Sequence, residues 1–134
     1  YLQYCKKVVY KSDCLYHYYQ RQTSVMRTYN KKYTDHILNY EANLKRIASK
    51  SNYTISQNDI LYLYLKCWFG VINQETQNPN PEDGLNRVKM FMNQSGLKNI
   101  KIHYSDLDSK YKVYKCLVKF HLTIPIYKLL KKRA

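Results

Sequence analysis

The chain has 134 residues, a length that suits one domain with one hydrophobic core. It contains 23 Lys and Arg residues against 9 Asp and Glu residues, which gives a formal net charge of +14. So large a charge favours an anionic partner, which can be nucleic acid, an acidic membrane, or an acidic glycan or protein. Because 45% of the residues are apolar, the composition is not that of a disordered chain.

The first two predicted helices cover residues 2–22 and 24–50. In the second, apolar and tyrosine side chains form one narrow stripe: Tyr29, Tyr33, Ile37, Tyr40, Leu44 and Ile47. Basic side chains occupy the other half of the helical wheel: Arg27, Lys31, Lys32, Lys45, Arg46 and Lys50. We therefore expect a core-facing stripe backed by a cationic face.

The third predicted helix covers residues 57–76. Ser56 and Asp59 have the spacing of a capping box at its start. The run ILYLYLKCWFGVI, residues 60–72, is apolar on nearly every side, and Lys66 is its only charged residue. It is too short to span a bilayer, so we expect a central helix packed on several sides. The alternative is a helix that exposes apolar surface to a membrane or partner.

The fourth predicted helix covers residues 81–95, with Asn80 as its cap, Pro81 at its first position and Gly96 as its stop. Ser105 and Asp108 predict a second capping box and a fifth helix over residues 106–122. Its lysines lie outside the apolar stripe: Lys110, Lys112, Lys115 and Lys119. The alternation of residues 111–120 also fits a strand.

We expect Pro125 to break the chain and to leave a basic tail over residues 125–134. With five helices and no long linker, the pattern predicts an all-α bundle that forms a single domain over residues 1–134. The apolar side chains of the tail are candidates for insertion at a membrane interface: Ile124, Ile126, Leu129 and Leu130. The basic helix faces would draw the protein to anionic lipid.

The sequence contains no nucleotide-binding, hydrolase or metalloprotease motif, so we expect no enzyme, no catalytic residue and no cofactor. The cysteines form no CxxC pair and no His lies at zinc-ligand spacing, so no metal site is expected. Four cysteines allow free thiols or disulfides: Cys5, Cys14, Cys67 and Cys116. Cys5 and Cys14 would lie on opposite faces of one helix and could not pair there.

Nucleic acid is a weaker candidate partner, because base stacking needs aromatic and cationic side chains on one exposed surface. In residues 24–50 the tyrosines and the lysines fall on opposite faces. A helical domain that binds nucleic acid is therefore kept as a further functional alternative.

The segment NKKYTDHILNYEANLKRIAS, residues 30–49, resembles the long second helix of the abalone sperm lysin family. The shared pattern is an Asn, two basic residues and a Tyr, then an Asn–Tyr pair and a basic exit. Here these positions are Asn30, Lys31, Lys32, Tyr33, Asn39, Tyr40, Lys45 and Arg46.

The resemblance implies a secreted protein of the sperm acrosomal vesicle, a five-helix bundle and no enzymatic activity. One kind of member dissolves the egg vitelline envelope by stoichiometric binding. Its fusagenic acrosomal paralogue is thought to mediate sperm–egg membrane fusion at fertilization. The preference for Lys and Tyr, the single Trp68 and the four cysteines point to the fusagenic paralogue, with lysin-like dissolution of the envelope as the alternative.

Two sequons, at Asn52 and Asn93, are compatible with secretion. The partner expected from charge and resemblance together is an anionic membrane surface or a component of the egg envelope. The sequence leaves open the cysteine pairing, the egg receptor, glycosylation of the sequons and the formation of a homodimer.

Overall fold

A computed structural model describes residues 28–50 and 54–133. These residues form six α-helices and two short 3-10 helices, and they contain no strand. The predicted all-α bundle is confirmed, and the strand alternative for residues 111–120 is wrong. The predicted helix 2–22 lies outside the described residues, as do Arg27, Cys5, Cys14 and Asn52.

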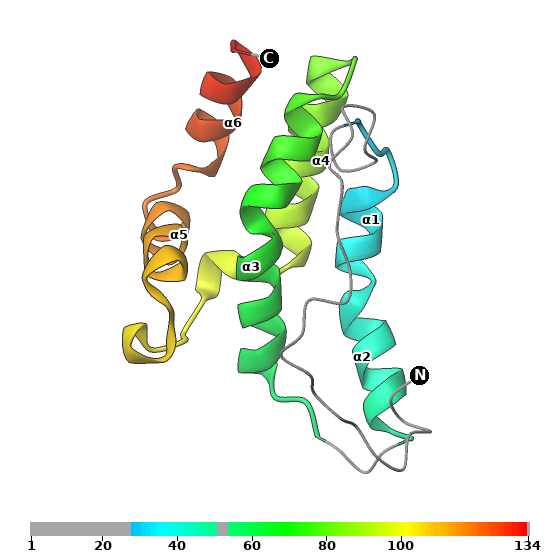
Figure 1. The fold of residues 1–134 in the computed structure, drawn as a ribbon, viewed down its shortest axis with the longest axis vertical. Helices are drawn as coiled ribbons and strands as arrows, with labels where there is room; N and C mark the ends of the chain where they lie inside the picture. Colours follow the sequence, from blue (N-terminus) through cyan, green and yellow to red (C-terminus); the bar gives the residue numbers. More distant parts are fainter. Residues whose placement is uncertain (1–27, 51–53, 134) are drawn as a thin grey trace, which may run out of the picture.

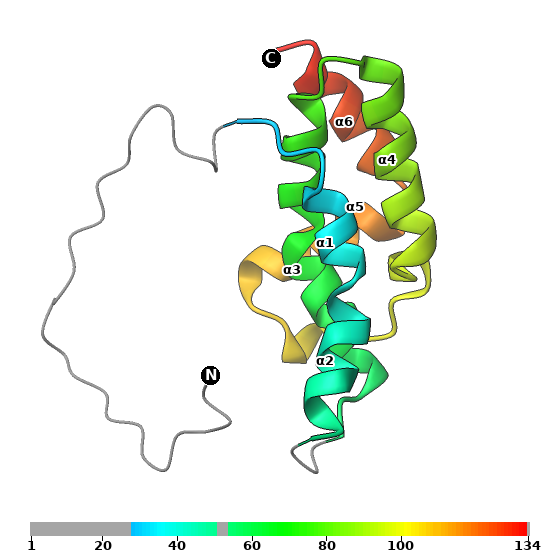
Figure 2. The ribbon, with the colours of Figure 1, turned by 90° about the vertical axis from the view of Figure 1, so that its right-hand side faces the viewer.

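Helix α3 (Gln57–Thr76) lies at the centre of the bundle, next to α4 (Pro81–Gln94). On one side lie α1 (Tyr33–Leu38) and α2 (Tyr40–Ala48), one after the other. On the other side lie α5 (Ser109–Lys119) and α6 (Thr123–Lys131) (Figure 1). Figure 2 shows α1 lying over both α3 and α4, with which it is in contact.

The position of α3 explains its apolar sequence. Ser56 Oγ accepts a hydrogen bond from the Asp59 N–H, and the Asp59 carboxylate accepts one from the Ser56 N–H, so the predicted capping box is present. The buried apolar side chains of α3 point in several directions: Ile60, Leu61, Tyr64, Leu65, Trp68, Val71 and Ile72. They contact α1, α4, α5 and α6, which is the packed central helix expected from the sequence.

The predicted helix over residues 24–50 is wrong in its extent. Residues 28–32 are not helical. The Asn30 side chain holds a turn here, because its Oδ1 accepts a hydrogen bond from the Lys32 N–H. Asn39 lies between α1 and α2, but it keeps right-handed helical backbone angles, and its N–H donates to the Asp35 carbonyl. The apolar stripe is buried only in part, since Ile37 is 2% exposed whereas Tyr40 is 38% exposed.

Helix α4 starts and stops where the sequence predicts. Asn80 Oδ1 accepts from the N–H groups of Glu82 and Asp83, and Pro81 takes the first helical position. Gly96 has a φ of 68°, the left-handed conformation that ends a helix. The chain then forms the 3-10 helix η3 (Leu97–Asn99), which leads away from α4 toward α5.

The second predicted capping box is wrong, and α5 starts later than residue 106. Ser105 Oγ donates to Asp106 Oδ1 inside the 3-10 helix η4 (Tyr104–Asp106), so Ser105 does not cap α5. Asp108 occupies the cap position instead. The helix ends at Lys119 rather than at residue 122, and Lys115, expected on the outer face, is buried.

The prediction that Pro125 breaks the chain is also wrong. Pro125 is the third residue of α6, within the first turn, where backbone N–H groups have no partner inside the helix. Most of the predicted tail 125–134 is therefore helical. At the far end of α6, Lys131 Nζ donates to the carbonyl oxygens of Thr76 and Asn78 and satisfies the C-terminal end of α3.

Candidate functional site

The first polar cluster in the bundle surrounds the fully buried carboxylate of Glu75, near the end of α3. Glu75 Oε1 accepts from Arg87 Nε at 3.0 Å and from Thr34 Oγ1 at 2.5 Å. Glu75 Oε2 accepts from Asn78 Nδ2 at 3.3 Å and from the Tyr29 hydroxyl at 3.4 Å. The cluster thereby ties the segment before α1, α1 itself, α3 and α4 to one another.

Arg87 extends this cluster and stays charged. Its Nη2 donates to the Lys31 carbonyl at 2.6 Å and to Asp35 Oδ2 at 3.1 Å. Burial alone would lower the pKa of Arg87, but hydrogen bonds and charges from Glu75 and Asp35 raise it above its ordinary value. Burial, together with the Glu75 charge, raises the pKa of Tyr29 to about 12. The carboxylate of Glu75 has no solvent access, and its hydrogen bonds join separate helices, which suits an internal tie between helices.

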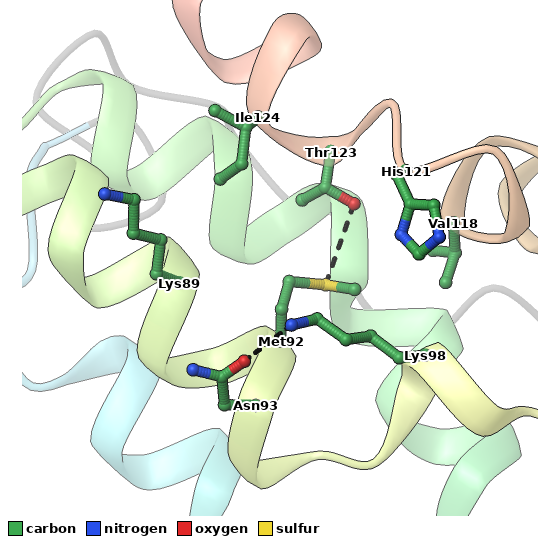
Figure 3. A pocket seen from close by; sticks show the side chains of 8 residues that line it. All are labelled: Lys89, Met92, Asn93, Lys98, Val118, His121, Thr123 and Ile124. Carbon is green, nitrogen blue, oxygen red and sulfur yellow. Dashed lines mark hydrogen bonds between the residues drawn. The ribbon is translucent and has the colours of Figure 1, made fainter.

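The second polar feature is a hollow of about 330 Å³ between α4, η3 and the α5–α6 turn (Figure 3). Met92 and Val118 form its apolar floor, and Lys89, Lys98 and His121 are its titratable lining groups. Lys98 Nζ donates to Asn93 Oδ1 at 2.7 Å, and the Thr123 hydroxyl lies 3.7 Å from Met92 Sδ. The hollow thus presents cations above an apolar base.

A larger hollow of about 630 Å³ adjoins the first, because Lys98 lines both. Four of its lining residues are lysines: Lys98, Lys101, Lys115 and Lys119. Lys115 is 7% exposed, its Nζ donates to the Ile102 carbonyl, and it lies 4.1 Å from the centroid of the Tyr104 ring. We call these four residues and Lys89 the lysine surface; no described Asp or Glu lines either hollow.

The charge of the whole chain is distributed in the same uneven way. Residues 85–134 contain 12 Lys and Arg and 2 Asp, a net charge of +10. Residues 1–84 contain 11 Lys and Arg and 7 Asp and Glu, a net charge of +4. Most of the excess charge therefore belongs to the part of the chain that forms α4, η3, α5 and α6, and this part contains the lysine surface.

The structure exposes the described members of the predicted basic face: Lys31, Lys32, Lys45, Arg46 and Lys50. Here, however, acids accompany the cations. Lys45 Nζ lies 2.7 Å from Glu41 Oε1, and Lys31 shares a shallow hollow of about 430 Å³ with Asp83. These residues are divided between the turn before α1, with Lys31 and Lys32, and the region of α2, with Lys45, Arg46 and Lys50.

Three of the four apolar candidates on the C-terminal segment pack against the core: Ile124, Ile126 and Leu130. Leu129 is 53% exposed. Sequence analysis did not single out Phe120, which is 65% exposed, or Leu122, which is 38% exposed. A signal for Phe120 was present, because this aromatic residue lies off the apolar stripe of the predicted fifth helix and between Lys119 and His121.

A third surface brings aromatic and cationic side chains together, which the predicted helix 24–50 did not. Tyr62 of α3 and Tyr111 of α5 make an edge-to-face contact with centroids 5.6 Å apart, and Phe69 stacks on Tyr114 at 5.9 Å. Lys66 Nζ lies 4.2 Å from the Tyr62 centroid. The sequence argument against base stacking therefore does not extend to the α3–α5 surface.

The described residues include two cysteines. Cys67 and Cys116 are partly buried and form no disulfide. Burial raises the pKa of the Cys67 thiol, against the opposing effect of the Lys66 charge, so the reactive thiolate is disfavoured. Within residues 28–50 and 54–133, no group of His, Cys, Asp and Glu is arranged to hold a metal ion.

None of the described helices combines the length and the apolar character that crossing a bilayer requires. Comparison with known proteins gives no match to a family model, a curated protein or a solved structure. The function is therefore inferred from the lysine surface, the predicted basic face and the aromatic surface between α3 and α5. The resemblance of residues 30–49 to the sperm lysin family stays a prediction.

Proposed function

We propose that this protein is a non-enzymatic, secreted protein of the sperm acrosomal vesicle that binds anionic membrane at the egg surface and promotes sperm–egg membrane fusion. The lysine surface is the observation that carries the membrane part of the proposal. Its hollows present several cations and no described carboxylate. Uncompensated cations of this kind attract a surface of anionic lipid.

The magnitude of this attraction is sufficient for reversible binding. A Lys or Arg residue close to an anionic bilayer contributes about 1 kcal/mol. Lys98, Lys101 and Lys119 are exposed, so together they would contribute about 3 kcal/mol, or roughly a hundredfold in partitioning. The attraction falls off within a Debye length, so it weakens as salt is added.

The family resemblance supports the fertilization part of the proposal. Residues 30–49, which carry the resemblance, form the turn before α1 and the two helices α1 and α2. Tyr33 and Leu44 of this segment pack against the core, while Lys45 and Arg46 are exposed. The segment thus contributes both to the bundle and to its cationic exterior.

Vesicle experiments test the proposal with the full chain. Vesicles of phosphatidylcholine with phosphatidylserine are compared with vesicles of phosphatidylcholine alone, at low and at high salt. We expect co-sedimentation and lipid mixing with the anionic vesicles only, with a loss of both as salt rises. The absence of binding to anionic vesicles at low salt would contradict the proposal.

Isolated egg envelopes separate the two activities that the resemblance implies. A protein that clears envelopes without cleaving covalent bonds, and that leaves vesicles unmixed, acts as a lysin. Clearing of envelopes together with vesicle binding would assign both activities to the same chain. We expect lipid mixing between vesicles, and we expect the isolated envelopes to stay intact.

Binding of nucleic acid is the second candidate function, and the α3–α5 aromatic surface is the observation that favours it. Tyr62 and Tyr111 could stack on bases, but their mutual contact and the lysines near them occupy part of the ring faces. Tight binding of an oligonucleotide with a steep salt dependence, without binding to vesicles, would favour this function.

A further inference from the structure

The turn between α5 and α6 displays apolar side chains on a fixed backbone. The His121 N–H donates to the Val118 carbonyl at 3.0 Å, and the Leu122 N–H donates to the Leu117 carbonyl at 2.9 Å. With His121 at a φ of 57°, these are the two hydrogen bonds of a Schellman motif. The position usually occupied by glycine is here a histidine. The two hydrogen bonds give the end of the helix a defined turn. Phe120, the most exposed large apolar side chain of the described residues at 65%, therefore projects from ordered backbone.

Residues that line the two hollows lie on both sides of Phe120 along the chain. Lys119, which precedes Phe120, lines the larger hollow, and His121, which follows it, lines the smaller one. Lys98 lines both hollows. Phe120 thus lies along the chain between a residue of the larger hollow and a residue of the smaller one, and Leu122 adds a second exposed apolar side chain after His121.

The larger hollow has the properties of a receptor for a phosphate group. Its volume of about 630 Å³ exceeds what a single phosphate needs, and four lysines line it. Lys115 is held in place by the Ile102 carbonyl and the Tyr104 ring. No described Asp or Glu forms an ion pair with any of the four lysines. The nearest acids along the chain have other partners, since Asp106 accepts from Ser105 and Asp108 accepts from Tyr62.

The combination of features distinguishes a lipid from a soluble phosphate. A soluble phosphate bound in the hollow would leave Phe120 and Leu122 in water. A phospholipid headgroup in the hollow would bring both side chains to the boundary between headgroups and acyl chains, where apolar burial adds to the electrostatic attraction. Lysine stems can follow apolar surface while their ammonium groups remain at the headgroups.

We infer that the α5–α6 turn is the membrane-contacting element of this protein. Phe120 and Leu122 enter the interface of an anionic bilayer, while the lysine-lined hollow beside them receives the phosphate of an anionic phospholipid. This inference rests on the proposed function and adds the surface that performs it. The apolar membrane contact is thus assigned to the α5–α6 turn, in place of Ile124, Ile126 and Leu130, which pack against the core.

Insertion of the turn is tested by tryptophan placed at two sites of similar exposure. Phe120→Trp and Val113→Trp are compared, since Val113 is 56% exposed on the same α5 but away from the turn. With phosphatidylserine vesicles, we expect the emission of the Phe120→Trp variant to shift to the blue and to be quenched by acyl-chain bromines, and the Val113→Trp variant to change little. Trp68 is fully buried and supplies a constant background. Equal quenching of both variants, or quenching of neither, overturns the inference.

The lysine hollow is tested by two double variants of equal charge. Lys101→Gln/Lys119→Gln removes two cations from the hollow, and Lys31→Gln/Lys32→Gln removes two from the turn before α1. We expect the first pair to weaken binding to phosphatidylserine vesicles about tenfold or more, and the second pair to weaken it less than about threefold. All four lysines are exposed, so the variants keep the fold, which circular dichroism checks.

The outcomes separate this inference from the proposed function. If the unaltered protein fails to bind the vesicles, both are overturned. If it binds but the two double variants weaken binding equally, the contact lies elsewhere and only the present inference fails. A heparin arm addresses the other anionic partner: loss of heparin binding in Lys101→Gln/Lys119→Gln, with vesicle binding unchanged, would assign the hollow to a sulfated glycan and overturn the lipid contact.

Discussion

The Glu75 cluster and the lysine surface use similar cationic side chains in opposite ways. In the cluster, Arg87 is 13% exposed and contacts two carboxylates, so its charge is compensated inside the protein. At the lysine surface, several lysines share two hollows without a described carboxylate. The compensated cation holds helices together, whereas the uncompensated cations are left for a partner outside the chain.

This difference also explains why net charge alone says little about a surface. The predicted basic face has six cations and the lysine surface has five, but Glu41 lies beside Lys45 and Asp83 shares a hollow with Lys31. A cation with a nearby acid offers less to a phosphate than one without. The comparison therefore predicts that variants in the cluster change stability, and that variants at the lysine surface change binding.

The largest expected effect is on Glu75. Replacing it in Glu75→Ala leaves Arg87 with one carboxylate fewer and deprives Thr34 and Tyr29 of their acceptor. Removing one partner of a buried ion pair costs about 3–5 kcal/mol. We expect a loss of this size in the free energy of unfolding, measured by urea denaturation and followed by far-UV circular dichroism.

The matched control is Glu41→Ala, which breaks an ion pair with the same kind of carboxylate at the surface. Glu41 and Lys45 side chains are 31% and 60% exposed. Exposed pairs contribute about 0–1 kcal/mol, so the control should lose little stability. Equal losses in the two variants would show that burial of the Glu75 pair does not matter and would break the comparison.

A smaller loss is expected where α4 approaches the cluster. A Cβ at Gly84 would lie 2.6 Å from the Glu75 carbonyl oxygen and 2.6 Å from the Tyr127 hydroxyl. Because one of these atoms is backbone, Gly84→Ala should lower the free energy of unfolding by about 1–3 kcal/mol. The same urea denaturation measures it.

Gly70→Ala is the control for this close approach. A Cβ at Gly70 would lie 2.7 Å from the Tyr33 hydroxyl, at the end of a side chain that can move. Alanine also favours a helix interior by about 1 kcal/mol over glycine, so the two effects oppose each other and the net change should stay within about 1 kcal/mol. A larger loss at Gly70 than at Gly84 would mean that α4 can shift away from α3.

The elements that the sequence predicts well depend on neighbours along the chain. Ser56 with Asp59, Asn80 with Pro81, and Gly96 act within one turn of helix, and the structure has all three. The failures occur where local rules compete. The Asn30 side chain holds a turn where the apolar period predicts a helix, and Pro125 is accepted because it falls in a first turn that the sequence does not mark.

The Glu75 cluster and the lysine surface could not be predicted from the sequence, for a different reason. The Glu75 cluster joins Thr34 and Arg87, which lie 41 and 12 residues from Glu75 along the chain. Periodicity describes one helix at a time and does not show which helices meet. The lysine surface similarly draws on α4, η3 and α5, and the burial of Lys115 depends on the Ile102 carbonyl in another segment.

The smallest expected effect is a pH dependence to which Tyr29 of the cluster contributes. The pKa of Tyr29 is about 12 in the folded protein, above the ordinary 10, mainly because of burial and secondly because of the Glu75 charge. Between these values the unfolded chain loses a proton that the folded chain keeps, so the stability from Tyr29 is full below pH 10 and is lost as pH rises toward 12.

Tyr29→Phe should therefore flatten the decline in urea midpoint from pH 9 to 11, although it removes the hydrogen bond to Glu75 and lowers the midpoint at both values. Burial also raises the pKa values of Tyr64 and Tyr127, so part of the decline should remain. Lys101→Gln/Lys119→Gln should keep the full decline, because neither lysine contacts the cluster. A decline unchanged in Tyr29→Phe would mean that the Tyr29 hydroxyl is not coupled to the buried Glu75 charge, and the internal compensation that separates the cluster from the lysine surface would have to be confined to Arg87.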